Sequence, residues 1–216
     1  MINAGRSFSG LERNCVFLNP GNLPEAGSRF VNISGASGLD FEDDARALAP
    51  VDWDHDGDLD LWISNRNAPR LRFLRNETPS KETRWIAFRL SGDGSDCNRD
   101  AIGARVELHS SNIPALRSIR TLRAGEGFLS QGSKWIHFGL GIKGRPEKVT
   151  VHWPDRARTV EEFDGLSENH RYLLVKGSGK AVVQPARDES LQLVPSPPKP
   201  LPPDRAARIP LATLFP

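Results

Sequence analysis

Apolar and polar residues alternate over short segments through the middle of the chain, from about residue 83 to residue 178. Glycine, proline, asparagine or aspartate bounds each segment, and convincing helical periodicity is scarce. The apolar positions of the predicted strands are Ile86, Phe88 and Leu90, Val106 and Leu108, Ile136, Phe138 and Leu140, Val149, Val151 and Trp153, and Tyr172 to Val175. Many short strands at this spacing are typical of a sandwich or barrel. We therefore expect an all-β fold built around an antiparallel β-sandwich.

The two ends of the chain have different patterns. Residues 1–80 read as a smaller, separate unit, in which strand-like alternation flanks one acidic segment. From residue 181 onward prolines crowd together, and such a sequence favours extended polyproline II over a packed core. The sequence thus predicts three regions: a repeat region with the acidic segment (1–80), the β-sandwich (81–180) and a Pro-rich linker or tail (181–216).

The acidic segment reads DWDHDGDLD over residues 52–60, with aspartates on alternate positions around Gly57. Carboxylates this close repel one another unless a cation lies among them. Calcium takes about six to eight oxygen ligands in flexible geometry, and a glycine permits the turn that gathers them. The predicted calcium ligands are the side chains of Asp52, Asp54, Asp56 and Asp60 and the backbone carbonyl of Asp58. The alternative is an ordinary solvated turn, which the restrictive spacing disfavours.

The residues that flank this segment predict a loop between two strands. An EF-hand loop of about twelve residues closes with a glutamate and lies between two helices. The corresponding last position here is Ile63, Pro50 precedes the loop, and Leu59, Leu61 and Ile63 alternate after its glycine. Such alternation is a strand signal. We therefore expect a structural calcium site that holds two strands together, and not a sensor that opens a helix pair.

Composition excludes several classes of protein. The 216 residues include 29 basic and 27 acidic ones, the formal charge is +2, and the basic residues are spread along the chain. This distribution indicates a solvated surface and no nucleic-acid partner. No run approaches the roughly 20 apolar residues of a membrane span. Cys15 and Cys97 form no CxxC pair, which excludes a thiolate zinc site and leaves either one disulfide or two free thiols.

Catalytic signatures are absent from the sequence. The segment GSGK at Gly177 lacks the upstream glycine of a phosphate-binding loop, and FLSQG at Phe128 is not the GxSxG of a nucleophile elbow. Glu161 and Glu162 are adjacent, so on a strand they would point to opposite faces. We therefore predict no catalytic residue and no enzymatic activity.

Three polar residues, Arg99, Gln131 and His137, occur in otherwise apolar surroundings. They could form a hydrogen-bonded network that fixes loop geometry, or they could line a ligand pocket. Buried polar groups in sandwiches are usually structural. The sequence leaves both interpretations open.

Two parts of the chain resemble known families. The DxDxDGxxD loop and its surroundings, RFVNISGASGLDFEDDARALAPVDWDHDGDLDLWISNRNAPRLRFLRN, resemble the FG-GAP (integrin-type, VCBS-like) repeats of β-propellers. NRDAIGARVEL from Asn98, AGEGFLSQGSKWIHFGLG from Ala124 and VTVHWPD from Val149 are similar to the ASPIC/UnbV domain. That is the C-terminal domain of the cartilage acidic protein family and its bacterial relatives. Together the resemblances cover roughly residues 12–178.

These resemblances imply a fold and a role. The first implies one or more blades of a partial β-propeller, with calcium at the aspartates of residues 52–60. The second implies an extracytoplasmic or secreted protein with a binding or adhesion role and no established catalytic activity. The N-terminus, MINAGRSFSG, lacks the apolar segment of a signal peptide, which leaves a cytoplasmic location open. We expect the chain to be part of a larger protein.

Two functions follow from the sequence. The first is a non-catalytic, calcium-stabilised module for binding, adhesion or scaffolding, with a protein or glycan partner and an oligomeric state that the sequence leaves open. The alternative is a carbohydrate-binding or carbohydrate-active, hydrolytic domain, suggested by Trp85, Trp135 and Trp153 in the predicted sandwich. Aromatic residues more often fill cores. An exposed tryptophan beside a carboxylate in a groove would favour the alternative, and buried tryptophans would favour the scaffold.

Overall fold

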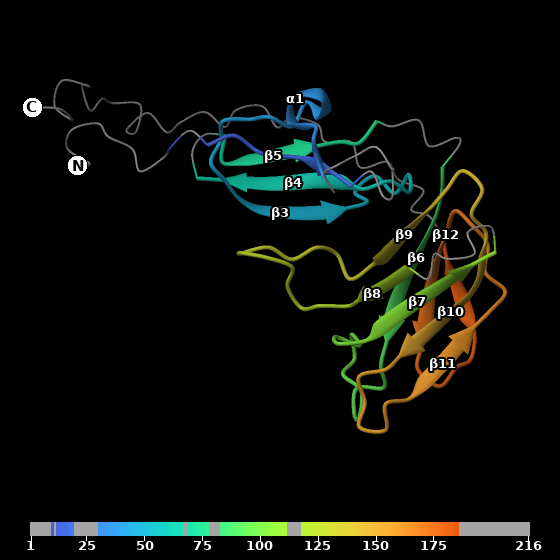
Figure 1. The fold of residues 1–216 in the computed structure, drawn as a ribbon. Helices are drawn as coiled ribbons and strands as arrows, with labels where there is room; N and C mark the ends of the chain where they lie inside the picture. The colour runs from blue at the N-terminus through green and yellow to red at the C-terminus, as the bar shows by residue number, and fades with distance from the viewer. Residues whose placement is uncertain are drawn as a thin grey trace, which may run out of the picture.

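The computed structural model describes residues 10, 12–19, 30–66, 69–77, 83–111 and 118–185. In these residues the regular structure is almost entirely β-strand, which confirms the all-β prediction (Figure 1). The strands are β1 (Phe17–Leu18), β2 (Val31–Asn32), β3 (Ala45–Val51), β4 (Asp60–Asn65), β5 (Leu71–Leu74), β6 (Arg84–Ser91), β7 (Arg105–Ser110), β8 (Ser118–Thr121), β9 (Ile136–Gly141), β10 (Pro146–His152), β11 (Val160–Phe163), β12 (His170–Val175) and β13 (Ala181–Gln184).

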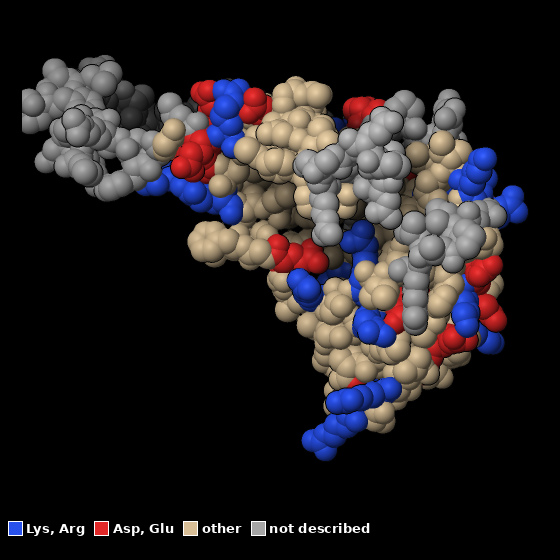
Figure 2. All heavy atoms as spheres, in the orientation of Figure 1, with Lys and Arg blue, Asp and Glu red and all other residues tan. Residues whose placement is uncertain are grey.

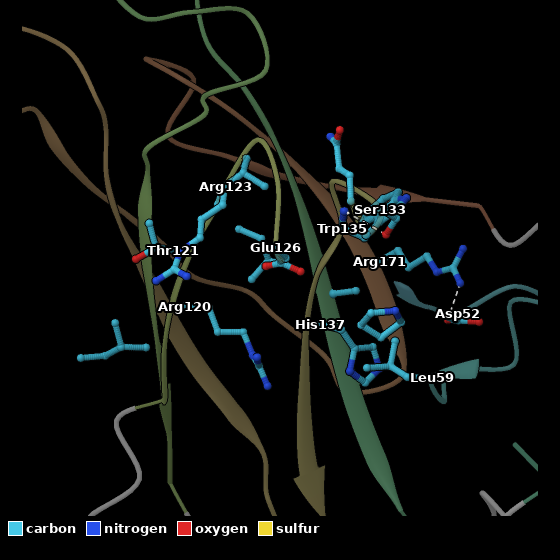
Figure 3. Close-up of a pocket in the computed structure, with 17 residues that line it drawn as sticks. Asp52, Leu59, Arg120, Thr121, Arg123, Glu126, Ser133, Trp135, His137 and Arg171 are labelled. Carbon is cyan, nitrogen blue, oxygen red and sulfur yellow. Dashed lines mark hydrogen bonds and ion pairs between the residues drawn. The ribbon is translucent and has the colours of Figure 1, made fainter. Parts of the chain in front are cut away.

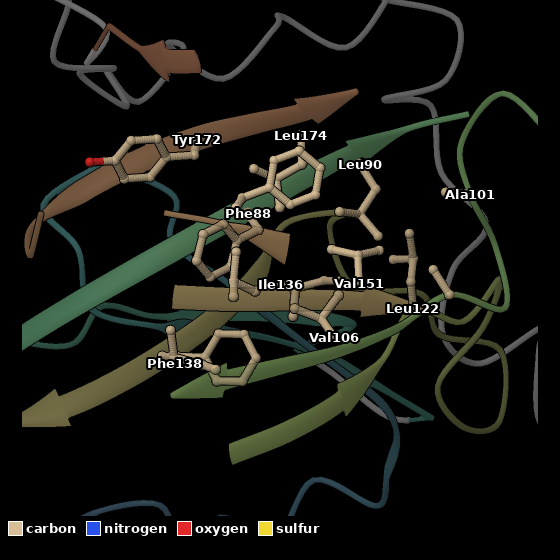
Figure 4. Close-up of a cluster of buried hydrophobic side chains, with 14 of the residues drawn as sticks. Phe88, Leu90, Ala101, Val106, Leu122, Ile136, Phe138, Val151, Tyr172 and Leu174 are labelled. Carbon is tan, nitrogen blue, oxygen red and sulfur yellow. The ribbon is translucent and has the colours of Figure 1, made fainter. Parts of the chain in front are cut away.

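Two four-stranded sheets make up the larger part of the structure, which we call the body (β6–β13). One sheet has the strand order β11-β10-β7-β8 and the other β13-β12-β6-β9. Apolar side chains of both sheets, among them Phe88, Phe138 and Val151, meet in one hydrophobic cluster (Figure 4). The alternating positions predicted from the sequence supply this core, since every second side chain of a strand points to the same face.

The pairing in the body departs from the predicted antiparallel sheet at one place. β12 runs parallel to β6, with His170 opposite Ile86, while the other strand pairs are antiparallel. Parallel neighbours need a long crossover connection. Here the connection contains β7 to β11, so the chain is long enough to return β12 in the same direction as β6.

Three strands of the body were not predicted: β8, β11 and β13. β11 has the sequence VEEF, and only Phe163 of it is buried, so its apolar alternation is too short to stand out. β13 lies within the predicted Pro-rich tail, whose first residues therefore belong to a sheet, paired with β12. Residues 186–216 of that predicted tail lie outside the described residues.

A separate three-stranded sheet, which we call the N-terminal sheet, consists of β3, β4 and β5 in that order. Both of its strand pairs are antiparallel. It is open at both edges, and the described residues form no closed sheet and no propeller. Within the described residues, this open sheet occupies the place of the predicted partial blade, and the propeller itself stays a prediction.

The remaining described elements are small. β1 and β2 form a two-stranded sheet, and α1 is a single turn at Ser34–Ser37. Across the part of the chain that is described, no helix is long and apolar enough to cross a membrane. Cys15 is exposed, Cys97 is buried and both are free, so of the two alternatives the structure contains free thiols.

Candidate functional site

The acidic loop, residues 52–59, connects β3 to β4, and Asp60 at the start of β4 closes it. One carboxylate oxygen of Asp60 accepts a hydrogen bond from the backbone N–H of Trp53 at 3.0 Å, and the other accepts one from that of Asn76 at 2.8 Å. Asp60 is almost completely buried. The prediction that strands flank this loop is confirmed, and Asp60 joins it to both neighbouring strands.

The other aspartates of the acidic loop converge. Asp52, Asp54 and Asp56 each place one carboxylate oxygen within 4.8 Å of the others. Asp54 accepts a hydrogen bond from the backbone N–H of Asp56, and Asp56 accepts one from that of Asp58 at 3.0 Å, which curls the backbone. Calcium binds oxygen at about 2.3–2.6 Å, so oxygens on opposite sides of one ion lie up to about 5 Å apart. The three carboxylates are close enough to share one ion.

Asp58 is the unexpected member of this group. Both of its carboxylate oxygens are buried without a hydrogen-bond partner in the described part of the chain, and Oδ1 of Asp52 is in the same state. Burial, followed by repulsion from Asp56 and Asp60, raises the pKa of Asp58 to about 7. A buried carboxylate without a partner is unfavourable unless a cation or a proton neutralises it. The sequence predicts only the backbone carbonyl of Asp58 as a ligand.

Arg171, on β12, connects the acidic loop to the body. Its Nη2 atom lies 2.5 Å from Oδ2 of Asp52, and the two side chains are only 9% and 10% exposed. The other terminal nitrogen of Arg171 donates a hydrogen bond to Nδ1 of His55. The guanidinium carbon also lies 5.8 Å from the ring centroid of Trp85 and 5.6 Å from that of Trp135. This buried ion pair joins residues 119 positions apart in sequence.

Gly57 is the second point of attachment. Its φ of +100° suits glycine, and a Cβ at this position would overlap the indole ring of Trp85 on β6. Its carbonyl oxygen lies 2.8 Å from Nε2 of His137 on β9, and His137 in turn stacks on Trp85. Burial lowers the pKa of His137, which favours the neutral ring with Nε2–H as the donor. The glycine predicted for the turn is therefore also needed for close contact with the body.

A groove of about 330 Å³ lies between the acidic loop and the body. β8 and β9, each at the edge of its own four-stranded sheet, and the loop that connects them (residues 122–135) form one side (Figure 3). Pro50, Asp52 and Leu59 contribute the other side. In Figure 1 the 122–135 loop extends beneath the N-terminal sheet, and Figure 2 shows the surface hollowed between them.

The three polar residues singled out in the sequence have different positions. His137 binds the acidic loop and, with Gln131, lines the groove. Arg99 is not among the residues that line the groove. Its side chain is 81% exposed and lies 3.2 Å from Asp100, which also binds Lys134. The structure thus brings Gln131 and His137 together and leaves Arg99 apart from them.

The three tryptophans considered in the sequence also divide. Trp153 is buried, and its Nε1 donates a hydrogen bond to Glu161. Trp85 packs against the acidic loop. Trp135 is half-buried and lines the groove together with two acidic residues, Asp52 and Glu126.

Residues 94–181 match the family model described as ASPIC and UnbV. The matched segment contains the strands β7 to β12, and with them His137, Arg171 and most of the groove. A search of curated protein sequences finds no match to the chain. The FG-GAP resemblance of the N-terminal region stays a prediction, and the resemblance to the ASPIC/UnbV family is confirmed for residues 94–181.

Proposed function

We propose that this chain is a non-catalytic, calcium-stabilised module for binding or scaffolding within a larger extracytoplasmic protein. In this proposal the N-terminal sheet is one repeat of the FG-GAP type, and the two four-stranded sheets pack as a sandwich. The match of residues 94–181 to the ASPIC/UnbV family supports the assignment of the body to such a module.

The observation that carries the calcium proposal is the burial of carboxylate oxygens without partners in the acidic loop. Oδ1 of Asp52 and both oxygens of Asp58 are in this state. Asp52 converges with Asp54 and Asp56. Burial, followed by repulsion from neighbouring aspartates that include these three, raises the pKa of Asp58. Carboxylate oxygens are the ligands that calcium prefers. These four residues would hold the ion, while Asp60 accepts two backbone hydrogen bonds and fixes the ends of the loop.

A bound calcium ion would supply positive charge inside the acidic loop. The loop contacts the body through Arg171, His137 and Trp85. Whatever holds the loop in this conformation therefore also holds the N-terminal sheet against the body. We infer that the metal acts as a structural staple between the two.

The hydrolytic alternative has less support. Glycoside hydrolysis generally uses two carboxyl groups on either side of the scissile bond. The acidic residues that line the groove are Asp52 and Glu126, and Asp52 is ion paired with Arg171. Glu161 and Glu162 are also engaged elsewhere, with Trp153 and Lys148. This supports a non-catalytic role.

Thermal unfolding of the full chain tests the proposal. Calcium at about 100 times its Kd stabilises the folded state by about 2.7 kcal/mol, which in a chain of this size raises Tm by about 5–10 °C. Excess EGTA should reverse the shift. Asp54→Ala should abolish it, because one of the converging carboxylates is lost.

The matched control is Asp164→Ala, which removes an exposed carboxylate outside the acidic loop. This variant should keep the full calcium shift. Equal Tm values in calcium and EGTA for the unmodified chain would overturn the calcium proposal, as would a shift that Asp54→Ala retains.

A further inference from the structure

The groove beside the acidic loop has the size of a small-molecule site. Its volume of about 330 Å³ falls at the lower end of the range of ligand pockets, about 300–1,000 Å³. It is also built from distant parts of the chain, because β8 and β9 belong to different sheets and Pro50 and Leu59 belong to the N-terminal region. The groove therefore forms only when the N-terminal region is packed against the body.

The charges along the groove favour an anion. Three arginines and two acidic residues line it, and one arginine, Arg171, is neutralised by Asp52. The remaining charged groups are Arg120, Arg123 and Glu126, which leaves an excess of positive charge. Arg120 and Arg123 are exposed and form no ion pair with any described residue. The guanidinium carbon of Arg120 lies 5.7 Å from the ring centroid of Phe138. Guanidinium groups bind carboxylate and sulfate through paired hydrogen bonds.

The rest of the lining favours a sugar as the carrier of that anion. Trp135 is half-buried in the groove, and an aromatic ring in this state can cover the apolar face of a pyranose. Thr121, Gln131 and Ser133 also line the groove, are exposed, and offer hydroxyl and amide groups to sugar hydroxyls. A purely apolar ligand would form no hydrogen bonds with these polar side chains.

We propose that this groove binds an anionic saccharide, with its carboxylate or sulfate group at Arg120 and Arg123 and a pyranose ring against Trp135. The inference rests on the proposed binding function and names its ligand class. Either a carboxylate or a sulfate on the sugar could supply the negative charge that the two arginines bind. The ligand is bound and not cleaved.

Isothermal titration calorimetry on the full chain tests this inference. The probes are cellobiouronic acid, which carries a carboxylate, cellobiose 6-sulfate, and neutral cellobiose. At least one anionic probe should bind at least about tenfold more tightly than neutral cellobiose, and which one it is identifies the anion. The double variant Arg120→Gln/Arg123→Gln should weaken its binding by at least about tenfold, since two charge-assisted contacts are lost.

The matched control is Arg145→Gln/Arg156→Gln, which removes the same charge from two exposed arginines outside the groove. Its affinity should stay within about twofold of the unmodified chain. Equal weakening by the two double variants would assign binding to overall charge and overturn the proposal. Equal affinity for neutral and anionic probes, or no binding of any probe, would overturn it as well.

Parallel titrations in calcium and in EGTA separate this inference from the proposed function. If calcium fails to raise Tm while the anionic probe still binds through Arg120 and Arg123, the calcium staple is wrong and the saccharide site stands. If calcium raises Tm and no probe binds, the staple stands and the saccharide site is wrong.

Discussion

The N-terminal region and the body are both built of β-strands, but different forces hold them together. In the body, buried apolar residues form one cluster that extends from Ile86 to Leu174. Among the described residues before the body, Ile63 is the only hydrophobic residue that is buried. Apart from Gly57, the other buried residues of this part are polar: Ser34, Asp43, Asp44, Asp60 and Asn65.

This difference has a physical consequence. Burial of apolar surface stabilises by roughly 25 cal/mol per Å² and does not depend on one particular contact. Buried polar groups contribute only when each one has a partner, and leaving one without a partner is costly. The body should therefore be stable by itself, whereas the N-terminal sheet depends on specific polar contacts, among them those between the acidic loop and the body.

The largest expected effect tests the body. Phe138 is 2% exposed and its ring centroid lies 6.0 Å from that of Phe88. Phe138→Ala should lower the free energy of unfolding by about 3–5 kcal/mol, because a large cavity replaces the ring. Urea unfolding measures this loss, and calcium should leave it unchanged. Phe128→Ala removes a ring that is 68% exposed and should change stability by less than about 0.5 kcal/mol. If calcium abolished the loss of unfolding free energy in Phe138→Ala, the stability of the body would depend on the metal and not on its apolar core.

The same difference explains what could be predicted from the sequence. Alternation at Ile86, Phe88 and Leu90 predicts both a strand and its buried face, because the period of two is local and all three residues are buried. The acidic loop is also a local pattern, so its position between strands could be predicted from its flanks. β11 and β13 were missed because their alternation is weak or falls beside prolines.

The contacts of the acidic loop could not be predicted in this way. Asp52 and Arg171 are 119 positions apart, and His55 and Arg171 are 116 apart. No local period connects such residues. The sequence singles out His137 as polar in apolar surroundings, but its partner, the carbonyl oxygen of Gly57, is a backbone atom with no signature in sequence. The groove combines the same distant segments, so its composition becomes visible only in the structure.

The next prediction concerns the buried ion pair. Arg171→Met should lower the free energy of unfolding by about 3 kcal/mol in EGTA, because it leaves the carboxylate of Asp52 buried without its partner. The loss should be smaller in calcium if the ion binds at the proposed site, because it would then also neutralise Asp52. Adding Asp52→Asn to Arg171→Met should recover part of the stability. Urea unfolding of the unmodified chain and of both variants, in calcium and in EGTA, measures these differences.

The control for this pair is Arg89→Met, an exposed arginine on β6. Its effect should be small and independent of calcium. If Arg171→Met costs no more than Arg89→Met, the N-terminal sheet does not depend on this contact.

A smaller effect is expected at Gly57. Gly57→Ala should cost about 2 kcal/mol, because alanine is strained at a φ of +100° and its Cβ would overlap Trp85. Hydrogen exchange should show faster exchange of backbone amides in β3 and β4, while amides of β10 stay protected. Gly35→Ala adds a methyl group where no atom lies within 4 Å and should leave exchange unchanged. Faster exchange in β10 would show that the two regions unfold as one unit.

The smallest effect is a pH dependence that belongs to the body alone. Lys176 lies 2.8 Å from Asp155 and 3.0 Å from Asp93. The hydrogen bond from Lys176, followed by those from Thr159, lowers the pKa of Asp155 from an ordinary 3.8 to about 2. Because the folded state holds this carboxylate ionised, its contribution to stability is complete above about pH 4 and is lost as the pH falls toward 2. Tm should decline over this interval, with and without calcium.

Lys176→Met should flatten this decline of Tm, because it removes the main cause of the lowered pKa of Asp155. The control is Lys148→Met, which removes a lysine paired with exposed Glu162. This variant should keep the part of the decline that is due to Asp155. A decline that is equally steep in Lys176→Met would show that other carboxyl groups control the acid unfolding of the body.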